Sequence, residues 1–485
     1  MFVYLPRIFF WKGLDIYLSF FKCLKPNILF LVIDSFRADK FSGSNKSSLT
    51  PNIDKMIQNG TYFKQAISSA DGTLLSWSSL LTALHPFKTG IRSEKLHKIN
   101  PDIKTYFDIL KDQGYYFYSQ LPSLSKTVGI FPEFENEDSF FDYYLTCTKG
   151  LGKKIINMLD SDLKTPWLAY LHIEDLHFPI EVPPDVNDEK YGLTNFDKAV
   201  SNLDTWIGRF IEKIDLEKTI VVLVSDHGSY LTSINHNGEQ ISLEVNSSLQ
   251  TTTRNIGKAV PNFLKPVKSK TFFALEKIRK QKRLSKVEKF NLKNHEKRGL
   301  LWQRSDVDHF LFDDVLHVPL VFLGYGIKSN MKISQQVRTI DIFPTICEII
   351  GLANRDNEID GRSLLPLIQG RELQELPNYI ESSHLSLEIV TNDVIGIRTS
   401  NYKYFRDIDN PKNRIHLFNL KEDPFEDENI AAKSPEIVDK HEDILQKMIK
   451  DSPEITEEIN EEETKKIEEE LKKLCLLYTS DAADE

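Results

Sequence analysis

The fold is decided by residues 27–34, which read Asn-Ile-Leu-Phe-Leu-Val-Ile-Asp. An uninterrupted run of aliphatic and β-branched residues of this length is typical of a strand that is buried on both faces of a parallel sheet. The run ends at Asp34, which places a carboxylate at the carboxyl end of the strand, where open α/β sheets bind their ligands. The stretch therefore predicts an α/β fold with a site at the end of its first strand.

A helix is predicted next, over residues 73–84, where apolar side chains recur at helical spacing after Asp71-Gly72. Thr73 stands at its start and is expected to be the N-cap residue. A hydroxyl at that point faces unpaired backbone N–H groups and the positive end of the helix dipole, which suits an anion. A lone threonine is most often only a cap, so any further role for Thr73 depends on the residues around it.

Two more apolar runs end in polar groups, as the first one does. Residues 165–173 lead into Glu-Asp-Leu-His at 174–177, and residues 219–224 lead into Ser-Asp-His-Gly at 225–228. Helical patterns lie between these runs, so strands and helices alternate. We therefore expect an α/β protein with a doubly wound, mostly parallel central sheet flanked by helices. Short strand-like runs after residue 375 add a small C-terminal antiparallel sheet.

The expected organisation follows from changes of composition along the chain. It comprises an N-terminal helical segment (1–25), a catalytic α/β domain (26–370) with a polar and then basic insertion (236–305), a C-terminal α+β subdomain (375–450), a charged helical tail (452–473), and a final stretch (474–485) that we interpret as non-native, adapter-derived sequence.

The net charge limits the class of binding partner, and the cysteine content indicates the cellular compartment. The 485-residue chain has a formal net charge of −10, which argues against a nucleic-acid partner. Its four cysteines form no CxxC pair, so free thiols in a reducing cytoplasm are expected. Residues 1–25 are either a helix packed on the domain or an interfacial membrane anchor. The insertion is either a solvated surface or a patch that attracts an anionic substrate or the inner face of the membrane.

The polar groups at the strand ends have the chemistry of a metal site. Asp34, Thr73, Asp226 and His227 come together in the inferred topology, and three further residues lie nearby: Asp175, His177 and His309. Carboxylates and imidazoles around a hydroxyl suit a divalent metal ion with an oxygen nucleophile. The threonine hydroxyl is nearly inert at neutral pH, and metal coordination would lower its pKa. Taken singly, each of these residues also has a structural explanation.

An ordered set of motifs extends this interpretation over residues 26–432. The motifs are Pro26–Asp34 with Arg37, Thr50–Asp54, Ser76–Thr82, Ser225–Gly228, Phe312–Asp314 with His317–Pro319, Asp360–Pro366, Arg398–Tyr404 and Leu417–Leu420 with Asp423-Pro424. In this order they resemble the sulfatase family of the alkaline phosphatase superfamily. The resemblance implies the α/β fold of that family and hydrolysis of an ester.

One departure from the family pattern falls on Thr73. Sulfatases carry at this position a cysteine or serine that is converted to formylglycine, and here Leu75 and Trp77 also replace the proline and arginine of their motif. Threonine has a β-methyl group and is not converted in this way. The chain is therefore similar to threonine-nucleophile members, which are phosphodiesterases, phosphatases and phosphoethanolamine-type transferases, and no formylglycine is expected.

The resemblance also implies roles for the residues. Asp34, Thr73, Asp226 and His227 would surround one metal ion, and Asp175, His177 and His309 would form a second metal site or contact the ester oxyanion. Arg37 would help to bind the substrate anion.

These roles lead to a functional prediction. One or two divalent ions (Zn, Mn or Ca) would support attack by Thr73 on a phosphate or sulfate ester, phosphate preferred, of a small molecule, glycan or lipid. The alternatives are a phosphoethanolamine-type transferase at the membrane surface and a non-catalytic anion- or glycan-binding relative.

Overall fold

The computed structural model describes residues 25–91, 99–123, 125–128, 130–141, 145–231, 233–236, 239–242, 281–301, 310–352, 359–382 and 393–450. Within this part of the chain, eight strands form the central sheet in the spatial order β10 (Met331–Arg338), β2 (Thr61–Ile67), β9 (His317–Gly324), β6 (Thr219–Val224), β1 (Asn27–Ile33), β5 (Trp167–Ile173), β3 (Tyr116–Pro122) and β4 (Phe140–Phe141). Strand β9 is antiparallel to both of its neighbours, and the other pairs are parallel. The predicted mostly parallel sheet is confirmed.

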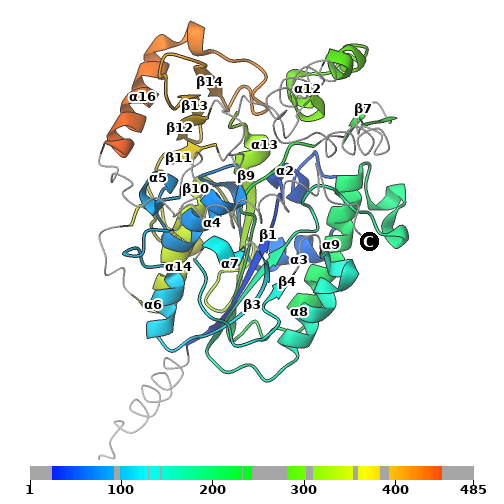
Figure 1. Cartoon of the computed structure of the whole chain (residues 1–485), viewed down its shortest axis with the longest axis vertical. Helices are drawn as coiled ribbons and strands as arrows, with labels where there is room; N and C mark the ends of the chain where they lie inside the picture. Colours follow the sequence, from blue (N-terminus) through cyan, green and yellow to red (C-terminus); the bar gives the residue numbers. More distant parts are fainter. Residues whose placement is uncertain are drawn as a thin grey trace, which may run out of the picture.

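Helices cover both faces of this sheet, as Figure 1 shows. Alternate residues of β1 point into two different cores, because successive side chains of a strand point to opposite faces. The core around Phe30 also contains residues of α4 (Thr73–Thr82), α6 (Tyr106–Asp112) and α14 (Ile342–Ile349). The core around Leu31 contains residues of α3 (Pro51–Asn59), α8 (Gly152–Leu159) and α9 (Asn195–Ile211). Strand β1 is thus buried on both faces, as its composition predicts.

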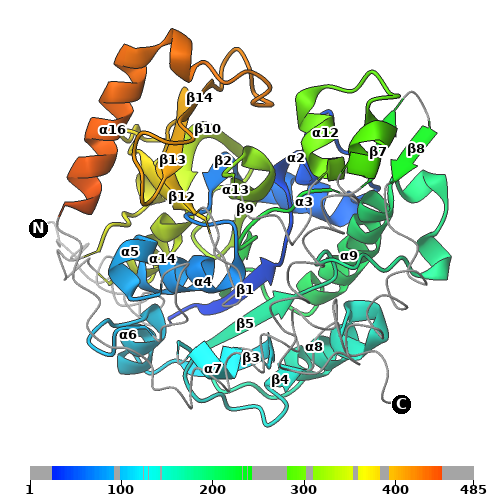
Figure 2. The same cartoon turned by 45° about the horizontal axis from the view of Figure 1, so that its top comes forward.

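A second, antiparallel sheet lies beside the first and packs against the long helix α16 (Pro435–Ile449) (Figure 2). Its strands are β11 (Asn378–Glu381), β12 (Val394–Arg398), β13 (Tyr402–Asp407) and β14 (His416–Asn419). This confirms the predicted small sheet and adds β11 to it. Ala70 and Glu381 form a parallel bridge, and the Glu381 amide donates to the Ser69 carbonyl at 2.9 Å. The small sheet is therefore hydrogen-bonded to the segment that leads into Thr73.

The other named elements among the described residues are short. They are α2 (Ala38–Phe41), α5 (Pro86–Thr89), α7 (Ser125–Val128), a π-helical turn (Cys147–Leu151), α12 (Asn294–Leu301), α13 (Asp313–Leu316), α15 (Leu365–Ile368), the β7–β8 hairpin (Ser233–His236 and Glu239–Ser242) and four 3₁₀ turns (Pro184–Val186, Glu189–Tyr191, Thr339–Asp341, Ala431–Lys433). The last residue of β7, the strand β8 and α12 lie within the predicted 236–305 insertion. Residues 1–24, 243–280 and 451–485, which carry the predicted anchor, most of the insertion and the tails, lie outside the described residues. None of the described helices has the length and apolar character that a membrane crossing requires.

Candidate active site

The site lies where three adjacent strands, β6, β1 and β5, end. Val32 of β1 is in register with His172 of β5 and with Val224 of β6. Asp34 follows β1 immediately, and Asp226 follows β6 after one intervening residue. Asp34, His172 and Asp226 each offer a ligand atom, and these atoms lie within 4.8 Å of one another. The sheet order therefore brings together two carboxylates that are far apart in the sequence, as their strand-end positions predict.

The carboxylates of Asp34 and Asp226 are both buried. The Ser35 hydroxyl donates to Oδ1 of Asp34 at 2.6 Å, and the His227 amide donates to Oδ1 of Asp226 at 2.8 Å. Oδ2 of Asp226, in contrast, has no hydrogen-bond partner among the described residues. Burial and the negative charge of Asp34 raise the pKa of Asp226. Because two neighbouring buried acids with an unsatisfied oxygen are costly in the absence of a cation, the pair suits a divalent ion.

Three histidines keep Asp34 ionised. Burial alone would raise the pKa of the Asp34 carboxyl, but the charge of His177, the hydrogen bond from His172 and the charge of His227 together hold it well below its ordinary value. His177 is half-buried in the turn after β5 and acts on Asp34 through its charge. His177, one of the two histidines predicted for a second metal site, is therefore close enough to Asp34 to act on its carboxylate.

Thr73 and His227 face each other beside these acids. Thr73 is the first residue of α4, and the N-cap is Gly72, so the predicted capping role of Thr73 is wrong. Its half-buried side chain places Oγ1 3.1 Å from Nε2 of His227 and 3.5 Å from Oδ2 of Asp34. Nδ1 of His227 lies 2.7 Å from the carbonyl oxygen of Gly228, which only accepts hydrogen bonds. Nδ1 therefore carries a proton, and in the neutral form of the ring Nε2 has the lone pair that can accept the proton of Thr73.

Close backbone packing holds the His227 loop. The Gly228 amide donates to the Val315 carbonyl at 2.8 Å, and a Cβ atom at Gly228 would meet the Asp314 carbonyl oxygen at 2.2 Å. Only glycine permits this approach. Burial lowers the pKa of His227, but the charges of Asp226 and Asp34 raise it above its ordinary value overall. The backbone thus fixes the orientation of the His227 ring, and the two carboxylates raise its pKa.

His172 is the site residue that the sequence analysis missed. Its Nε2 lies 3.2 Å from Oδ2 of Asp34, and its Nδ1 lies 3.3 Å from Nε1 of Trp77. Burial lowers the pKa of His172, whereas the hydrogen bond with Asp34 and the charge of Asp226 raise it above its ordinary value overall. The signal that could have revealed it is a lone polar side chain in the otherwise apolar run 167–173, one residue before the strand ends.

Two predicted metal ligands do not join the group in the structure. Oδ2 of Asp175 accepts the Cys147 amide at 2.9 Å, and burial raises the pKa of Asp175 to about 6. This carboxyl therefore holds the π-helical turn and is not part of the group formed by Asp34, His172 and Asp226, so its predicted role at a second metal site stays a prediction. His309 lies outside the described residues, so its predicted role stays a prediction.

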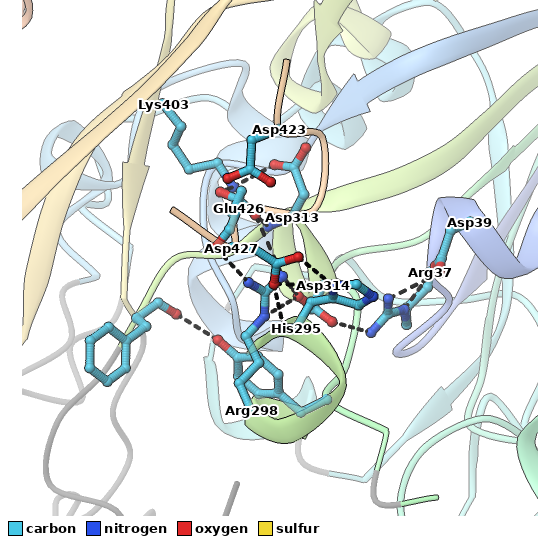
Figure 3. A network of polar contacts seen from close by, with 12 residues as sticks. Arg37, Asp39, His295, Arg298, Asp313, Asp314, Lys403, Asp423, Glu426 and Asp427 are labelled. Carbon is cyan, nitrogen blue, oxygen red and sulfur yellow. Dashed lines mark hydrogen bonds and ion pairs between the residues drawn. The ribbon is translucent and has the colours of Figure 1, made fainter. Parts of the chain in front are cut away.

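The guanidinium of Arg37 forms hydrogen bonds with other groups of the protein. It donates to Asp39 at 2.8 and 3.0 Å and to Asp314 (Figure 3). It also donates to the Ser229 carbonyl at 3.2 Å. Asp314 also pairs with Arg298 of α12, which joins part of the insertion to the same network. These donors of Arg37 are thus engaged with protein groups, and its role in substrate binding stays a prediction.

The family follows from a comparison with protein-family models. The Sulfatase model matches residues 26–352, and the model of the C-terminal region of N-sulphoglucosamine sulphohydrolase matches residues 306–454. Together with the fold and the strand-end carboxylates, these matches show that the chain belongs to the sulfatase family, as its motifs suggest.

Among curated proteins, the chain is similar to arylsulfatase K of Homo sapiens, with 33% identity over 133 residues, and to arylsulfatase K of Danio rerio, with 28% identity over 153 residues. These matches cover 26% and 31% of this chain. The chain spans only about a quarter of the length of these relatives, 24% of the human protein and 29% of the fish protein.

Solved structures share the fold at low identity. The phosphonate monoester hydrolase of Agrobacterium radiobacter aligns with a TM-score of 0.61 and 15% identity, over 90% of this chain and 98% of that one. A protein solved in complex with its substrate D-glucosamine-2-N,6-O-disulfate aligns with a TM-score of 0.58 and 15% identity, over 90% of this chain and all (100%) of that one.

These comparisons correct the cofactor prediction. The expectation of no formylglycine is wrong, because the sulfatase family and the arylsulfatase K relatives typically use formylglycine together with Ca²⁺. Within the broader set of Zn, Mn or Ca, the family thus implies Ca²⁺.

The residues of the site fit these two cofactors unequally. Asp34 and Asp226, with a carboxylate oxygen that lacks a hydrogen bond, have the oxygen chemistry that Ca²⁺ prefers. At the start of α4, the β-methyl group of Thr73 does not fit conversion to an aldehyde, so no step below passes through formylglycine.

Proposed function

We propose that the chain is a metal-dependent hydrolase of sulfate or phosphate esters, in which Thr73 is the nucleophile and His227 takes its proton. The observation that carries this proposal is the 3.1 Å contact between Oγ1 of Thr73 and Nε2 of His227, next to two buried carboxylates. A nucleophile within hydrogen-bond reach of a base, whose other nitrogen is oriented by a third group, is the arrangement of nucleophilic catalysis.

Asp34 and Asp226 would hold the divalent ion. When bound, this ion neutralises their charge, lowers the pKa of a nearby hydroxyl and polarises the ester oxygens. The remaining oxygens of the substrate anion would face the N–H groups in the first turn of α4, which are suited to an anion.

The chemistry at Thr73 then proceeds in two displacements. Oγ1 of Thr73 attacks the sulfur or phosphorus atom while its proton passes to Nε2 of His227, and the bond to the leaving alcohol oxygen breaks. The leaving alkoxide takes a proton from solvent and departs as the alcohol. Water next attacks the sulfur or phosphorus atom of the Thr73 ester and gives up a proton to solvent, the bond to Oγ1 breaks, the protonated His227 returns its proton to Oγ1, and inorganic sulfate or phosphate is released.

Different features favour the two ester classes. The arylsulfatase K relatives favour a sulfate ester, and the structural neighbour with bound glucosamine disulfate supports a glycan-linked one. The preference for phosphate rests on Thr73 alone. A sulfated glycan is therefore the first substrate class to test, and a phosphate ester is the second.

The test compares turnover of sulfate monoesters, phosphate monoesters and phosphate diesters with Ca²⁺ present. We expect Thr73→Ala to reduce kcat on the order of a thousandfold or more, because the attacking oxygen is lost. Thr73→Ser, which keeps the hydroxyl, should retain measurable turnover, and Thr205→Ala on the exposed side of α9 is the control. Undiminished turnover by Thr73→Ala would contradict the nucleophile assignment.

A further inference from the structure

The two histidines beside Asp34 have Nδ1 partners of opposite kind. Nδ1 of His227 lies 2.7 Å from a carbonyl oxygen, that of Gly228, which can only accept. Nδ1 of His172 lies 3.3 Å from the indole Nε1 of Trp77, which can only donate. The same ring atom must therefore be protonated in His227 and must keep its lone pair in His172.

This difference decides what each ring offers to the site. A neutral histidine has one N–H and one lone pair. With Nδ1 as acceptor, Nε2 of His172 carries the proton, and it lies 3.2 Å from Oδ2 of Asp34, to which it donates. In His227 the proton is on Nδ1, so Nε2 carries the lone pair. Asp34 thus has a donor on each oxygen, Ser35 on Oδ1 and His172 on Oδ2.

A histidine that binds a metal ion normally donates its other N–H to a carbonyl or carboxylate. His227 has such a partner, and His172 does not. For Nε2 of His172 to face a cation with a lone pair, Nδ1 would need a proton that points at the indole N–H of Trp77. His172 therefore has the position of a ligand, within 4.8 Å of both acids, but not the required tautomer.

Trp77 is well placed to keep His172 in the tautomer with its proton on Nε2. Its side chain is fully buried in α4, it packs edge-on against the His172 ring at a centroid distance of 4.8 Å, and it packs edge-on against Phe131 at 5.3 Å. Such packing leaves the indole little freedom to turn its N–H away. Trp77 is also the residue that stands where the family motif has arginine.

We propose that Trp77 holds His172 as an Nε2–H donor to Asp34, which makes His172 a positioning residue and keeps its nitrogen out of the metal site. The ion is then bound chiefly by carboxylate oxygens, which suit Ca²⁺, and one imidazole that would favour Zn²⁺ is withheld. Because this inference rests on the proposed metal-dependent function, its test must separate the two.

The test measures binding of Ca²⁺ and of Zn²⁺ to the metal-stripped full chain by calorimetry. Trp77→Phe keeps an aromatic ring but removes the N–H, so the His172 ring can change tautomer and coordinate. We expect Trp77→Phe to raise the ratio of Zn²⁺ to Ca²⁺ affinity on the order of tenfold. Trp167→Phe, which changes another buried tryptophan at the far end of β5, should leave the ratio unchanged.

Two substitutions of His172 provide a second, independent readout. His172→Gln can donate an amide N–H to Asp34 and should keep Ca²⁺ affinity near that of the wild type. His172→Leu cannot donate and should weaken Ca²⁺ binding about 10- to 100-fold. Nitrogen NMR of ¹⁵N-histidine-labelled, Ca²⁺-loaded protein should show an Nε2–H signal that is absent from His172→Gln.

The outcomes distinguish the inference from the proposed function. If His172→Gln loses as much Ca²⁺ affinity as His172→Leu, or if the Nε2 proton is absent in the loaded protein, His172 is a ligand and the positioning role is overturned while the metal-dependent function stands. The positioning role is likewise overturned if Trp77→Phe behaves like Trp167→Phe. A wild-type chain that binds neither ion overturns both.

Discussion

Nε2 of His227 lies 3.1 Å from the hydroxyl oxygen of Thr73, and the opposite edge of the same ring is held by the carbonyl of its neighbour Gly228. The ring of His227, the proposed base, is therefore oriented by the main chain and not by an acidic side chain. Since Gly228 also packs against the Asp314 carbonyl, the orientation of the ring depends on a backbone contact that any side chain at residue 228 would break.

Replacing the base should slow the reaction without unfolding the protein. His227→Gln keeps a polar side chain of similar length but cannot take up the Thr73 proton. We expect kcat to fall about 10²- to 10⁴-fold, the usual contribution of a general base. Measured at saturating substrate and Ca²⁺, the loss should be absent from His236→Gln in the β7 strand. An unchanged kcat for His227→Gln would remove His227 from the proton transfer.

Removal of Ca²⁺ should lower the thermal stability of the protein. Asp34 and Asp226 are buried side by side, and a bound cation would relieve their repulsion. Binding stabilises the folded state by about 2.7 kcal/mol when the free ion is at roughly 100 times its Kd. Tm should therefore fall on addition of a chelator, and Asp226→Asn should show a smaller Ca²⁺-induced gain.

The control for this measurement is Asp204→Asn. Asp204 is a buried acid of α9 that accepts the Ile53 amide at 2.7 Å, so its loss should lower Tm but preserve the full gain from Ca²⁺. A wild-type Tm that is the same with Ca²⁺ and with chelator would be incompatible with a metal site at Asp34 and Asp226.

Arg37 should prove important for stability and not for substrate affinity. Arg37→Met keeps much of the side-chain volume but leaves Asp39 and part of Asp314 without their donors. We expect a loss of about 1–3 kcal/mol in the free energy of unfolding, the cost of unsatisfied charged groups at a largely buried site, with KM close to that of the wild type. Lys164→Met, which removes an exposed ion pair with Glu135, should change neither. A large rise in KM at unchanged stability would support the substrate-binding role.

The pH dependence of stability should report on Glu426, a buried acid in the network of Figure 3. Lys403 lies 2.7 Å from Glu426 and is shared with Asp313. Burial raises the pKa of Glu426 from 4.5 to about 7. A raised folded-state pKa gives stability that is complete below about pH 4.5 and is lost as the pH rises through about 7.

The variant that tests this is Glu426→Gln, which does not titrate. Its Tm relative to the wild type should increase between pH 5 and pH 8, corresponding to at most about 3 kcal/mol in the free energy of unfolding. Glu428→Gln, which changes a surface acid paired with Lys433, should show a constant difference. A Tm difference for Glu426→Gln that stays flat or decreases with pH would show that Glu426 is ionised throughout.

The strand-end acids could be predicted from the sequence because an apolar run that stops at a carboxylate defines both a strand and its polar end. This rule predicts Asp34, Asp226 and His227, and the structure places them close together. His172 could not be found by this rule, because it lies inside the run and its contact with Asp34 depends on which strands are neighbours. Order in the sheet is set by packing between distant segments, and the local pattern does not contain it.

Arg37 and Asp175 mark the limit of this rule. Each follows a strand that delivers site residues, and the resemblance to the sulfatase family implies a role in the site for each. The structure turns both side chains to other partners, because the loop after a strand end can direct successive residues to different sides. Direction of this kind depends on the backbone angles of a few loop residues, such as the φ of +63° at Ser35.

The bridge between Ala70 and Glu381 has a consequence for the order in which the protein is built. A ribosome synthesises Asp34, Thr73, Asp226 and His227 well before it reaches the strand that pairs next to Thr73. Until β11 has been synthesised, the nascent chain lacks the hydrogen bond between the Glu381 amide and the Ser69 carbonyl, whereas the Ser68 hydroxyl already has the Asp226 carbonyl available. The contact between the small sheet and this segment can therefore form only after all four site residues have been synthesised.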